Sequence, residues 1–240
     1  MIQSSSELVD FLRSYHASLL AEEPPRPLEP APFEIPRSLD ILYRTFGNLI
    51  EGWHGPLNTQ DFLRVPAKLE AKEGKIFFLD ENQNCWTCAY AEEFPHPVFR
   101  CEDNELPVLQ CDSLEVFLIA FGLQEALMSS PWLLSIDDVT KAEDLGLALE
   151  PLLLGGSYAY ESPSHAFWIT GHGEIVADLF GQLWIGSYAP IPSEHRKSEF
   201  TYNLISCPDA EAERSWIARL DPPPKAPGFL GRAIGKWFPK

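Results

Sequence analysis

The stretch KIFFLDENQNCWTCAY, residues 75–90, decides the fold. It begins with an apolar run, which is typical of a short strand, and a polar cluster follows, which is typical of a turn. The chain then alternates, so that Trp86, Cys88 and Tyr90 share one face of an expected second strand. A further apolar run at 97–100 favours another strand. The simplest structure for this region is an antiparallel β-meander.

Two helices are expected before this meander. Ser4 lies three residues before Glu7, which is the spacing of a capping box, and apolar residues follow at helical intervals. The six prolines of residues 22–36 cannot continue a helix or donate to a sheet, so we expect a stiff extended connector there. A second apolar stripe after Pro36 predicts another helix, which ends at Gly47.

A third helix is expected after the meander. Asp112 lies three residues before Glu115, which predicts a second capping box. The residues that follow form a stripe at helical spacing, and only its last member is polar. Such a stripe belongs against a sheet. Its members are Leu114, Phe117, Leu118, Phe121 and Glu125.

The composition changes after residue 131. Residues 137–149 have a helical pattern, whereas glycines separate short apolar and aromatic runs from 152 to 186, which is typical of antiparallel hairpins. Asp209 is expected to cap a last helix, which ends at three consecutive prolines. We therefore predict an α+β chain in four parts: a helix with its connector (1–34), a central domain (35–131), a C-terminal α+β region (132–221) and a tail (222–240).

The composition limits the function. The 240 residues are 45% hydrophobic, which excludes a wholly disordered chain, and no apolar run is long enough for a transmembrane helix. The 35 acidic and 18 basic residues give a net charge of −17, which disfavours direct binding to nucleic acid and favours basic partners. The first twenty residues lack the pattern of a secretion signal, so we expect a cytoplasmic protein with reduced cysteines.

Cysteines provide one candidate metal or redox site. Cys85 and Cys88 have C-x-x-C spacing, but the alternating pattern places their thiols on opposite faces of a strand. Cys101 and Cys111 are ten residues apart, so they do not supply the second close pair that a zinc site needs. We predict structural thiols, with no metal and no cofactor.

Histidines provide one candidate catalytic site. His165 and His172 could meet Asp178 in the C-terminal region, with Ser164 or Ser187 as a nucleophile, which would make the protein a hydrolase. The chain contains no nucleophile elbow, no P-loop and no Gly-x-Gly-x-x-Gly motif. We therefore predict that the protein is not an enzyme and has no catalytic residues.

Residues 35–129 resemble the SUKH superfamily, which includes fungal cell-wall regulators and many bacterial toxin-immunity proteins. Four segments carry the resemblance: Ile35-Pro36 with the helix that ends at Gly47-Asn48, the strand 76–79 that runs into Glu81-Asn82-Gln83 with Trp86 three residues later, the pair Pro97-Val98, and Leu114 with Phe117-Leu118.

The resemblance implies a fold and a kind of function. It implies a twisted, mainly antiparallel sheet flanked by helices, in a non-catalytic binding module. Bacterial members commonly bind a cognate toxin and block it, so we expect an immunity protein whose partner is a basic toxin domain. The alternative is a regulatory or scaffold protein, similar to the fungal members, that recruits a signalling or envelope partner through the connector or the tail. The oligomeric state stays open.

The polar turn of the meander is the first candidate for partner binding. A turn at the rim of a sheet projects polar groups outward, so Glu81, Asn82 and Gln83, with Trp86 beside them, could contact a partner. Alternatively, these polar side chains satisfy backbone groups inside the turn, and Trp86 belongs to the core.

The tail is the second candidate. From Lys225 onward it has no acidic residue, and its apolar and basic residues recur at helical spacing. It could lie on an anionic membrane surface or in a partner's groove, or it could dock on the acidic body of its own chain. The residues proposed for these contacts are Phe229, Leu230, Arg232, Ile234, Lys236 and Trp237.

Overall fold

The computed structural model describes residues 1–51, 55–103, 105–137, 139, 141–156, 165–179, 181–191, 200–209 and 211–213. Helices and antiparallel sheets together form an α+β fold, as the sequence predicts. The chain divides into two compact units, Met1–Ser206 and Cys207–Lys240.

The predicted meander is confirmed and belongs to a larger sheet. In this first sheet the strands are ordered β1-β3-β4-β5-β6, β2 pairs with β3, and every pairing is antiparallel. Alternation along the strands places one row of side chains, from Ile76 through Tyr90 and Val98 to Cys111, on the face that contributes to the core. The six strands are β1 (Asp61–Leu63), β2 (Glu70–Lys72), β3 (Lys75–Glu81), β4 (Thr87–Ala91), β5 (Val98–Cys101) and β6 (Val108–Cys111).

Helices pack on this sheet and beside one another. The described helices of the first unit are α1 (Ser5–Tyr15), α2 (Ala17–Glu22), α3 (Arg37–Phe46) and α4 (Leu114–Met128). Three short 3-10 turns accompany them: η1 (Gly47–Ile50), η2 (Pro66–Lys68) and η3 (Ala142–Leu145). The predicted start and end of the second helix are confirmed, because α3 follows Pro36 and gives way at Gly47, whose φ is +49°. The connector after α2 contains no helix or strand through Pro36, as its prolines predict.

A second sheet lies on the other side of α4. Its strand order is β12-β7-β11-β10-β9-β8, and all its pairings are antiparallel. The predicted hairpins are confirmed, with Gly173 and Gly181 at positive φ in the turns before and after β10. The six strands are β7 (Trp132–Asp137), β8 (Leu149–Gly156), β9 (His165–Thr170), β10 (Ile175–Leu179), β11 (Gln182–Ser187) and β12 (Thr201–Ser206).

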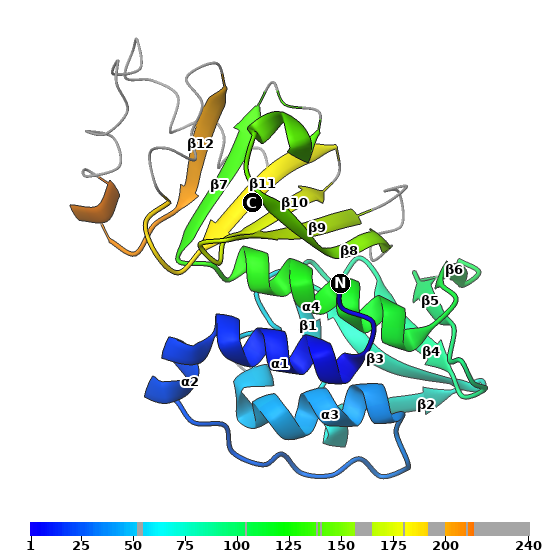
Figure 1. Cartoon of the computed structure of the whole chain (residues 1–240). Helices are drawn as coiled ribbons and strands as arrows, with labels where there is room; N and C mark the ends of the chain where they lie inside the picture. Colours follow the sequence, from blue (N-terminus) through cyan, green and yellow to red (C-terminus); the bar gives the residue numbers. More distant parts are fainter. Residues whose placement is uncertain are drawn as a thin grey trace. The chain divides into compact units, whose positions relative to one another are not determined.

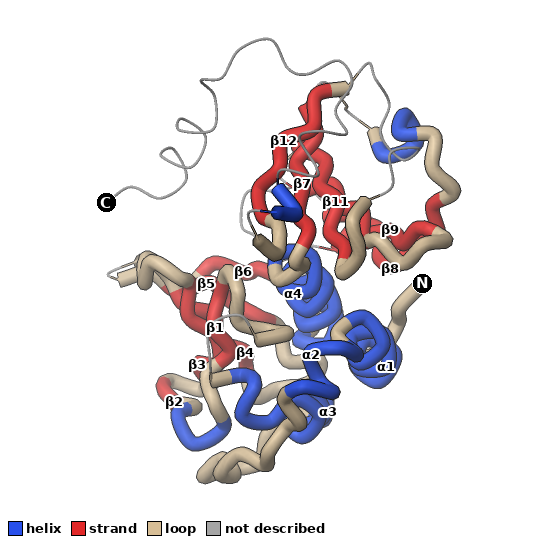
Figure 2. Tube along the Cα trace, turned by 90° about the vertical axis from the view of Figure 1, so that its left-hand side faces the viewer, coloured by secondary structure: helices blue, strands red, loops and turns tan. Residues whose placement is uncertain are grey.

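The central element of the first unit is α4. Figures 1 and 2 both show it between the second sheet and a layer that contains α1, α3 and the first sheet, and it contacts elements on both sides. Twelve of its fifteen residues are buried, so it has no polar face of the kind that surface helices carry.

One hydrophobic core therefore serves both sheets. Fully buried side chains from α1, α3, the first sheet, α4 and the second sheet belong to one cluster, represented by Leu8, Phe46, Phe78, Phe117 and Phe167. The boundary that we placed after residue 131 lies between α4 and β7, and the core continues across it. The N-terminal helix, which we placed outside the central domain, also contributes to this core.

Two local predictions are wrong. Residues 137–149 are not one helix: β7 ends at Asp137, the 3-10 turn η3 is the only helical turn among the residues described between β7 and β8, and Gly146 ends it at a φ of +69°. Strand pairing takes the two ends of the predicted helix, because Asp137 pairs with Thr201 in β7 and Leu149 pairs with Thr170 in β8. The capping box at Asp112 is wrong as well. α4 begins after Ser113 without a side-chain cap, and the Glu115 carboxylate instead accepts the backbone N–H of Ser5 at 2.9 Å.

The other two predicted caps are confirmed. Ser4 Oγ accepts the backbone N–H of Glu7 at 3.3 Å at the start of α1. In the second unit, Asp209 Oδ1 accepts the backbone N–H of Glu211 at 2.9 Å and that of Ala212 at 2.8 Å. The remainder of that predicted helix lies outside the described residues.

The close approach of β11 to α4 yields a first testable prediction. A Cβ atom at Gly186 would lie 2.4 Å from Ser130 Oγ and 3.0 Å from the backbone oxygen of Leu127. Because a backbone atom cannot move aside cheaply, we expect Gly186→Ala to lower the free energy of unfolding by about 1–2 kcal/mol in urea denaturation. Gly171→Ala is the matched control, since its Cβ would meet nothing within 4 Å. Equal stability of the two variants would contradict this packing of the second sheet on α4.

Candidate functional site

The predicted partner-binding turn joins β3 to β4. Glu81 Oε2 accepts the backbone N–H groups of Gln83 and Cys85, at 2.9 and 3.0 Å. The side chain of Glu81 therefore closes the turn, while Gln83 is exposed. Trp86 is half-buried and packs against the core. Of the two interpretations that the sequence left open, these contacts agree with the one in which Glu81 satisfies backbone groups.

Asn82 attaches this turn to the segment before β1. Its backbone N–H donates to Asp61 Oδ1 at 3.2 Å, and its side-chain amide donates to Gln60 Oε1 at 3.3 Å. The side chain of Asp61 is only 6% exposed. The position of the Glu-Asn-Gln turn thus depends on a buried carboxyl group twenty-one residues earlier in the chain.

Glu125 holds the same segment from the opposite side. It is fully buried in α4, and its carboxyl oxygens accept the backbone N–H groups of Thr59 at 2.5 Å, Gln60 at 3.0 Å and Asp61 at 3.3 Å. The sequence contained a signal for this role, because Glu125 is the one polar member of an otherwise apolar stripe. A buried carboxyl group needs such partners to offset its desolvation.

Burial also changes the acidity of both groups. Desolvation raises the pKa of Asp61 to about 8, with a further contribution from the charge of Glu125. Desolvation likewise raises the pKa of Glu125 to about 7, although its three backbone donors act in the opposite direction. At neutral pH the two carboxyl groups therefore bind more protons in the folded state than they would in water.

An exposed apolar surface lies elsewhere, around β6. Five of the large hydrophobic side chains that are exposed come from residues 94–116, and Phe94 and Leu106 are each 87% exposed. They belong to three adjacent segments: the loop before β5, the β5–β6 hairpin and the start of α4, where the backbone N–H of Leu114 donates to Pro95 O. By the strand pairing, the loop before β5 lies beside the end of β6 and the hairpin turn lies at the start of β6, and Figure 1 shows β5 and β6 at the border of the first sheet. We define the β6 surface as Phe94, Leu106, Val108, Leu109 and Val116.

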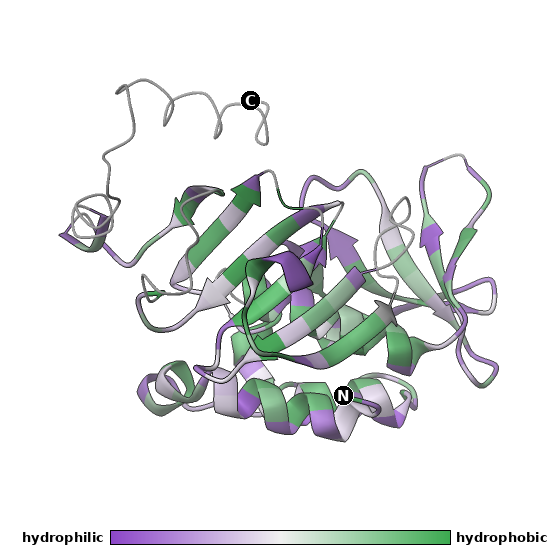
Figure 3. Ribbon diagram, turned by 45° about the horizontal axis from the view of Figure 1, so that its top comes forward, coloured by the Kyte–Doolittle hydropathy of each residue, from purple (hydrophilic) through white to green (hydrophobic). Residues whose placement is uncertain are grey.

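Acidic residues are frequent in the segments that form the β6 surface. The only arginine or lysine between residues 92 and 115 is Arg100, and it forms an ion pair with Glu102. Figure 3 shows hydrophobic and hydrophilic residues side by side in the β5–β6 hairpin. Exposed apolar area rimmed by charge is typical of a protein–protein contact. The acidic residues are Glu92, Glu93, Glu102, Asp103, Glu105, Asp112 and Glu115. Sequence reasoning missed this surface, because exposure of an edge strand depends on the order of strands in the sheet.

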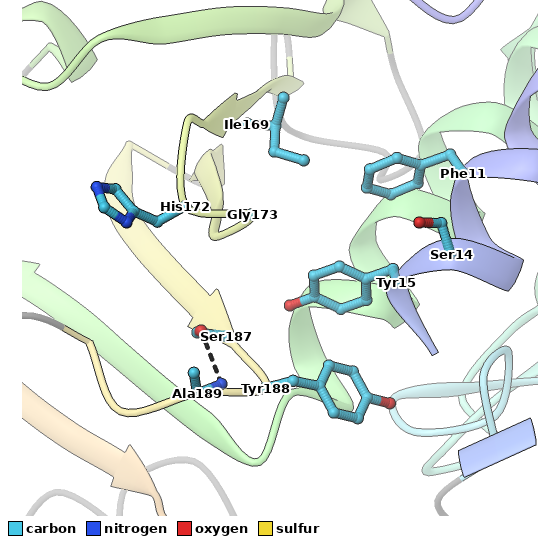
Figure 4. A pocket seen from close by; sticks show the side chains of 9 residues that line it. All are labelled: Phe11, Ser14, Tyr15, Ile169, His172, Gly173, Ser187, Tyr188 and Ala189. Carbon is cyan, nitrogen blue, oxygen red and sulfur yellow. Dashed lines mark hydrogen bonds between the residues drawn. The ribbon is translucent and has the colours of Figure 1, made fainter. Parts of the chain in front are cut away.

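A small pocket lies between α1 and the second sheet. Figure 4 shows its walls, which include Phe11 and Tyr15 of α1 and Tyr188 after β11. Its volume is about 250 Å³, which is below the roughly 300 Å³ at which ligand pockets begin. The hydroxyl of Tyr15 already bonds Ser130 Oγ at 2.6 Å, and that of Tyr188 bonds His16 Nδ1 at 2.5 Å. Size and satisfied hydroxyls therefore favour the β6 surface as the candidate site.

The histidines of the hydrolase alternative are not brought together. β9 begins at His165 and ends at Thr170, so His165 and His172 lie at opposite ends of this strand. Asp178 is paired across the sheet with Ala166, the neighbour of His165, so the side chains of Asp178 and His165 lie on opposite faces. Burial lowers the pKa of His165 to about 4. Ser164 lies outside the described residues. Ser187 and His172 both line the small pocket, where Ser187 Oγ accepts the backbone N–H of Ala189 at 3.1 Å.

The two cysteines of the C-x-x-C pair are separated, but not as opposite faces of one strand, because β4 begins only at Thr87. Cys85 is exposed in the β3–β4 turn, whereas Cys88 is buried in β4. Burial raises the pKa of the Cys88 thiol, which makes it less reactive. Within the described part of the chain, no group of three or more His, Cys, Asp or Glu residues is placed to hold a metal ion.

The tail residues proposed for partner or membrane contact, from Phe229 to Trp237, lie outside the described residues. In the described part of the chain, no helix has both the length and the apolar character needed to cross a membrane.

Comparisons of the chain with protein-family models, with curated proteins and with solved structures give no match. The SUKH resemblance therefore stays a prediction from the sequence motifs.

Proposed function

We propose that this protein is a non-enzymatic binding module that neutralises a basic toxin domain by forming a stoichiometric complex with it. The β6 surface is the observation that carries the proposal, because it combines exposed apolar side chains with many acidic residues in the same segments. Acidic side chains that face the toxin's basic cleft would occlude it.

Each component of the surface has a separate physical role. Burial of Phe94, Leu106 and Leu109 in a complex removes apolar area from water, which supplies affinity. The carboxylates in the same segments accelerate association with a basic partner and disfavour acidic ones. The net charge of −17 extends the same preference over the whole chain.

The sequence resemblance supports the same function. Toxins that attack nucleic acid need basic surfaces, and bacterial proteins with SUKH motifs commonly neutralise such toxins. A cytoplasmic location belongs to this proposal, because such an inhibitor protects the cell that makes it.

The proposal predicts a salt-sensitive complex of equal stoichiometry. The full chain is titrated calorimetrically into each toxin domain encoded beside its gene, and toxin activity is measured in parallel. We expect a 1:1 complex that abolishes activity, with a Kd that rises about tenfold between about 50 and about 300 mM NaCl.

A pair of matched double variants localises the contact. Asp103→Asn with Glu105→Gln removes two exposed charges beside β6, and we expect it to weaken the complex about three- to tenfold, mainly through slower association. Glu29→Gln with Glu34→Gln removes two exposed charges from the connector and is the control. Equal weakening by both pairs would argue against the β6 surface, and no binding to any neighbouring basic domain would refute the function.

A further inference from the structure

We propose that β6 receives an extended, basic segment of the partner as an added strand of the first sheet. This inference rests on the proposed function and specifies how its partner docks. The segment is an uncharged, β-forming stretch of about four residues with Lys or Arg on both sides.

The first observation is the position of β6 in its sheet. β6 is the last strand in the order β1-β3-β4-β5-β6, and among the described residues no strand pairs with its outer side. An edge strand has backbone N–H and C=O groups that point away from the sheet. Proteins that bind extended peptides use such edges to form backbone hydrogen bonds, while side-chain pockets provide specificity.

The second observation is that β6 is apolar and exposed on both of its faces. Val108 and Leu109 are neighbours in a strand, so their side chains point to opposite faces of the sheet. Val108 is 37% exposed and Leu109 is 52% exposed. A partner that lay on one face of the sheet would cover only one of them. A strand added at the edge straddles the sheet and covers both.

The third observation is the charge beside this edge. β6 itself has no charged residue, whereas Glu105 precedes it and Asp112 follows it. These two acids are seven residues apart, which corresponds to about 23 Å in an extended chain. A bound segment of six to eight residues with basic ends would therefore place its charges near both acids. Two copies of this chain would instead bring like charges together, which disfavours pairing of β6 with itself.

The test uses a defined peptide. The probe has eight residues, with two lysines at each end and Val-Thr-Val-Thr between them, and it is titrated into the uniformly ¹⁵N-labelled full chain. We expect shifts of the backbone amide signals of Val108–Cys111, together with slower hydrogen exchange of the amides that point outward. We expect a peptide with glutamate in place of lysine to bind at least tenfold more weakly.

Backbone methylation separates strand addition from other modes of binding. Methylating alternate nitrogens on one edge of the peptide removes its hydrogen-bond donors there and keeps its charge. We expect the peptide methylated on the edge that faces β6 to bind at least tenfold more weakly than the peptide methylated on its opposite edge. Equal affinity of both would overturn strand addition, while lysine-dependent binding would leave the proposed function standing.

Other occupants give distinguishable results. A synthetic peptide of residues 225–240 that binds β6 more tightly than the lysine probe would make the chain's own tail the occupant and would overturn the proposal. A dimer in sedimentation that Leu109→Thr dissolves would make a second copy the occupant, with the same consequence. If the lysine probe binds β6 and no toxin domain does, strand addition stands and the proposed function fails.

Discussion

Replacing Glu125 by leucine is expected to lower the free energy of unfolding by about 3–5 kcal/mol in urea denaturation. Leucine fits an apolar helix, but it leaves the backbone N–H groups of Thr59, Gln60 and Asp61 without their acceptor. The cost of those unmet donors exceeds any gain from removing a buried carboxyl group, because each unmet buried donor costs about 1–3 kcal/mol.

Two further variants test whether the loss comes from the missing hydrogen-bond acceptor, and not from a change of charge or from any substitution in α4. Glu125→Gln keeps one acceptor oxygen, so we expect a loss of only about 1–2 kcal/mol. Glu115→Gln alters an exposed acidic residue of the same helix. The carboxylate of Glu115 accepts the backbone N–H of Ser5, and we expect its replacement to lower the free energy of unfolding by less than about 1 kcal/mol. If Glu125→Leu were as stable as the unaltered protein, the network around residues 59–61 would not matter to the fold.

Stability is expected to fall by about 2 kcal/mol as the pH rises from 6.5 to 8. The pKa values of Asp61 and Glu125 are about 8 and about 7 in the folded protein, above their usual values near 4. The folded state therefore binds more protons than the unfolded chain in this range. Their stabilising contribution is complete below the unfolded pKa and is lost as the pH rises through the folded pKa.

Two buried histidines have the opposite effect at lower pH. Burial lowers the pKa of His16 and of His165 to about 4, below the unfolded value near 6.5. Their contribution is complete above about pH 7.5, where the unfolded histidines are neutral, and is lost as the pH falls towards 4. Between pH 6.5 and 8 the unfolded histidines release their remaining protons, which offsets less than about 1 kcal/mol, so the carboxyl pair sets the direction of the change and stability falls.

The measurement is the free energy of unfolding in urea at half-unit intervals of pH. In Asp61→Asn the loss between pH 6.5 and 8 should shrink to less than half of its value in the unaltered protein. Exposed Asp103→Asn is the control and should leave the slope unchanged. A flat profile above pH 6.5 in the unaltered protein would mean that the two carboxyl groups are ionised in the folded state.

The candidate sites differ in how far the sequence could locate them. The Glu81-Asn82-Gln83 turn was located correctly, because turn composition and strand alternation are local signals. What Asn82 contacts depends on Gln60 and Asp61, and no local pattern joins these segments to the turn. The β6 surface was missed for a similar reason: Val108 and Leu109 resemble core residues in sequence, and only the strand order leaves them at an edge.

By itself, the sequence determined the α+β class, the cap at Ser4, the hairpins around β10 and the acidic character of the chain. These features depend on hydrogen bonds within a few residues, on side-chain periodicity or on composition. Only the tertiary structure decided that residues 137–149 are not one helix, that α4 is buried between two sheets and that Glu125 holds a loop more than sixty residues away. Burial and strand pairing depend on contacts with segments far along the chain. The free energy of these contacts can exceed a local helix or strand preference and so reverse it.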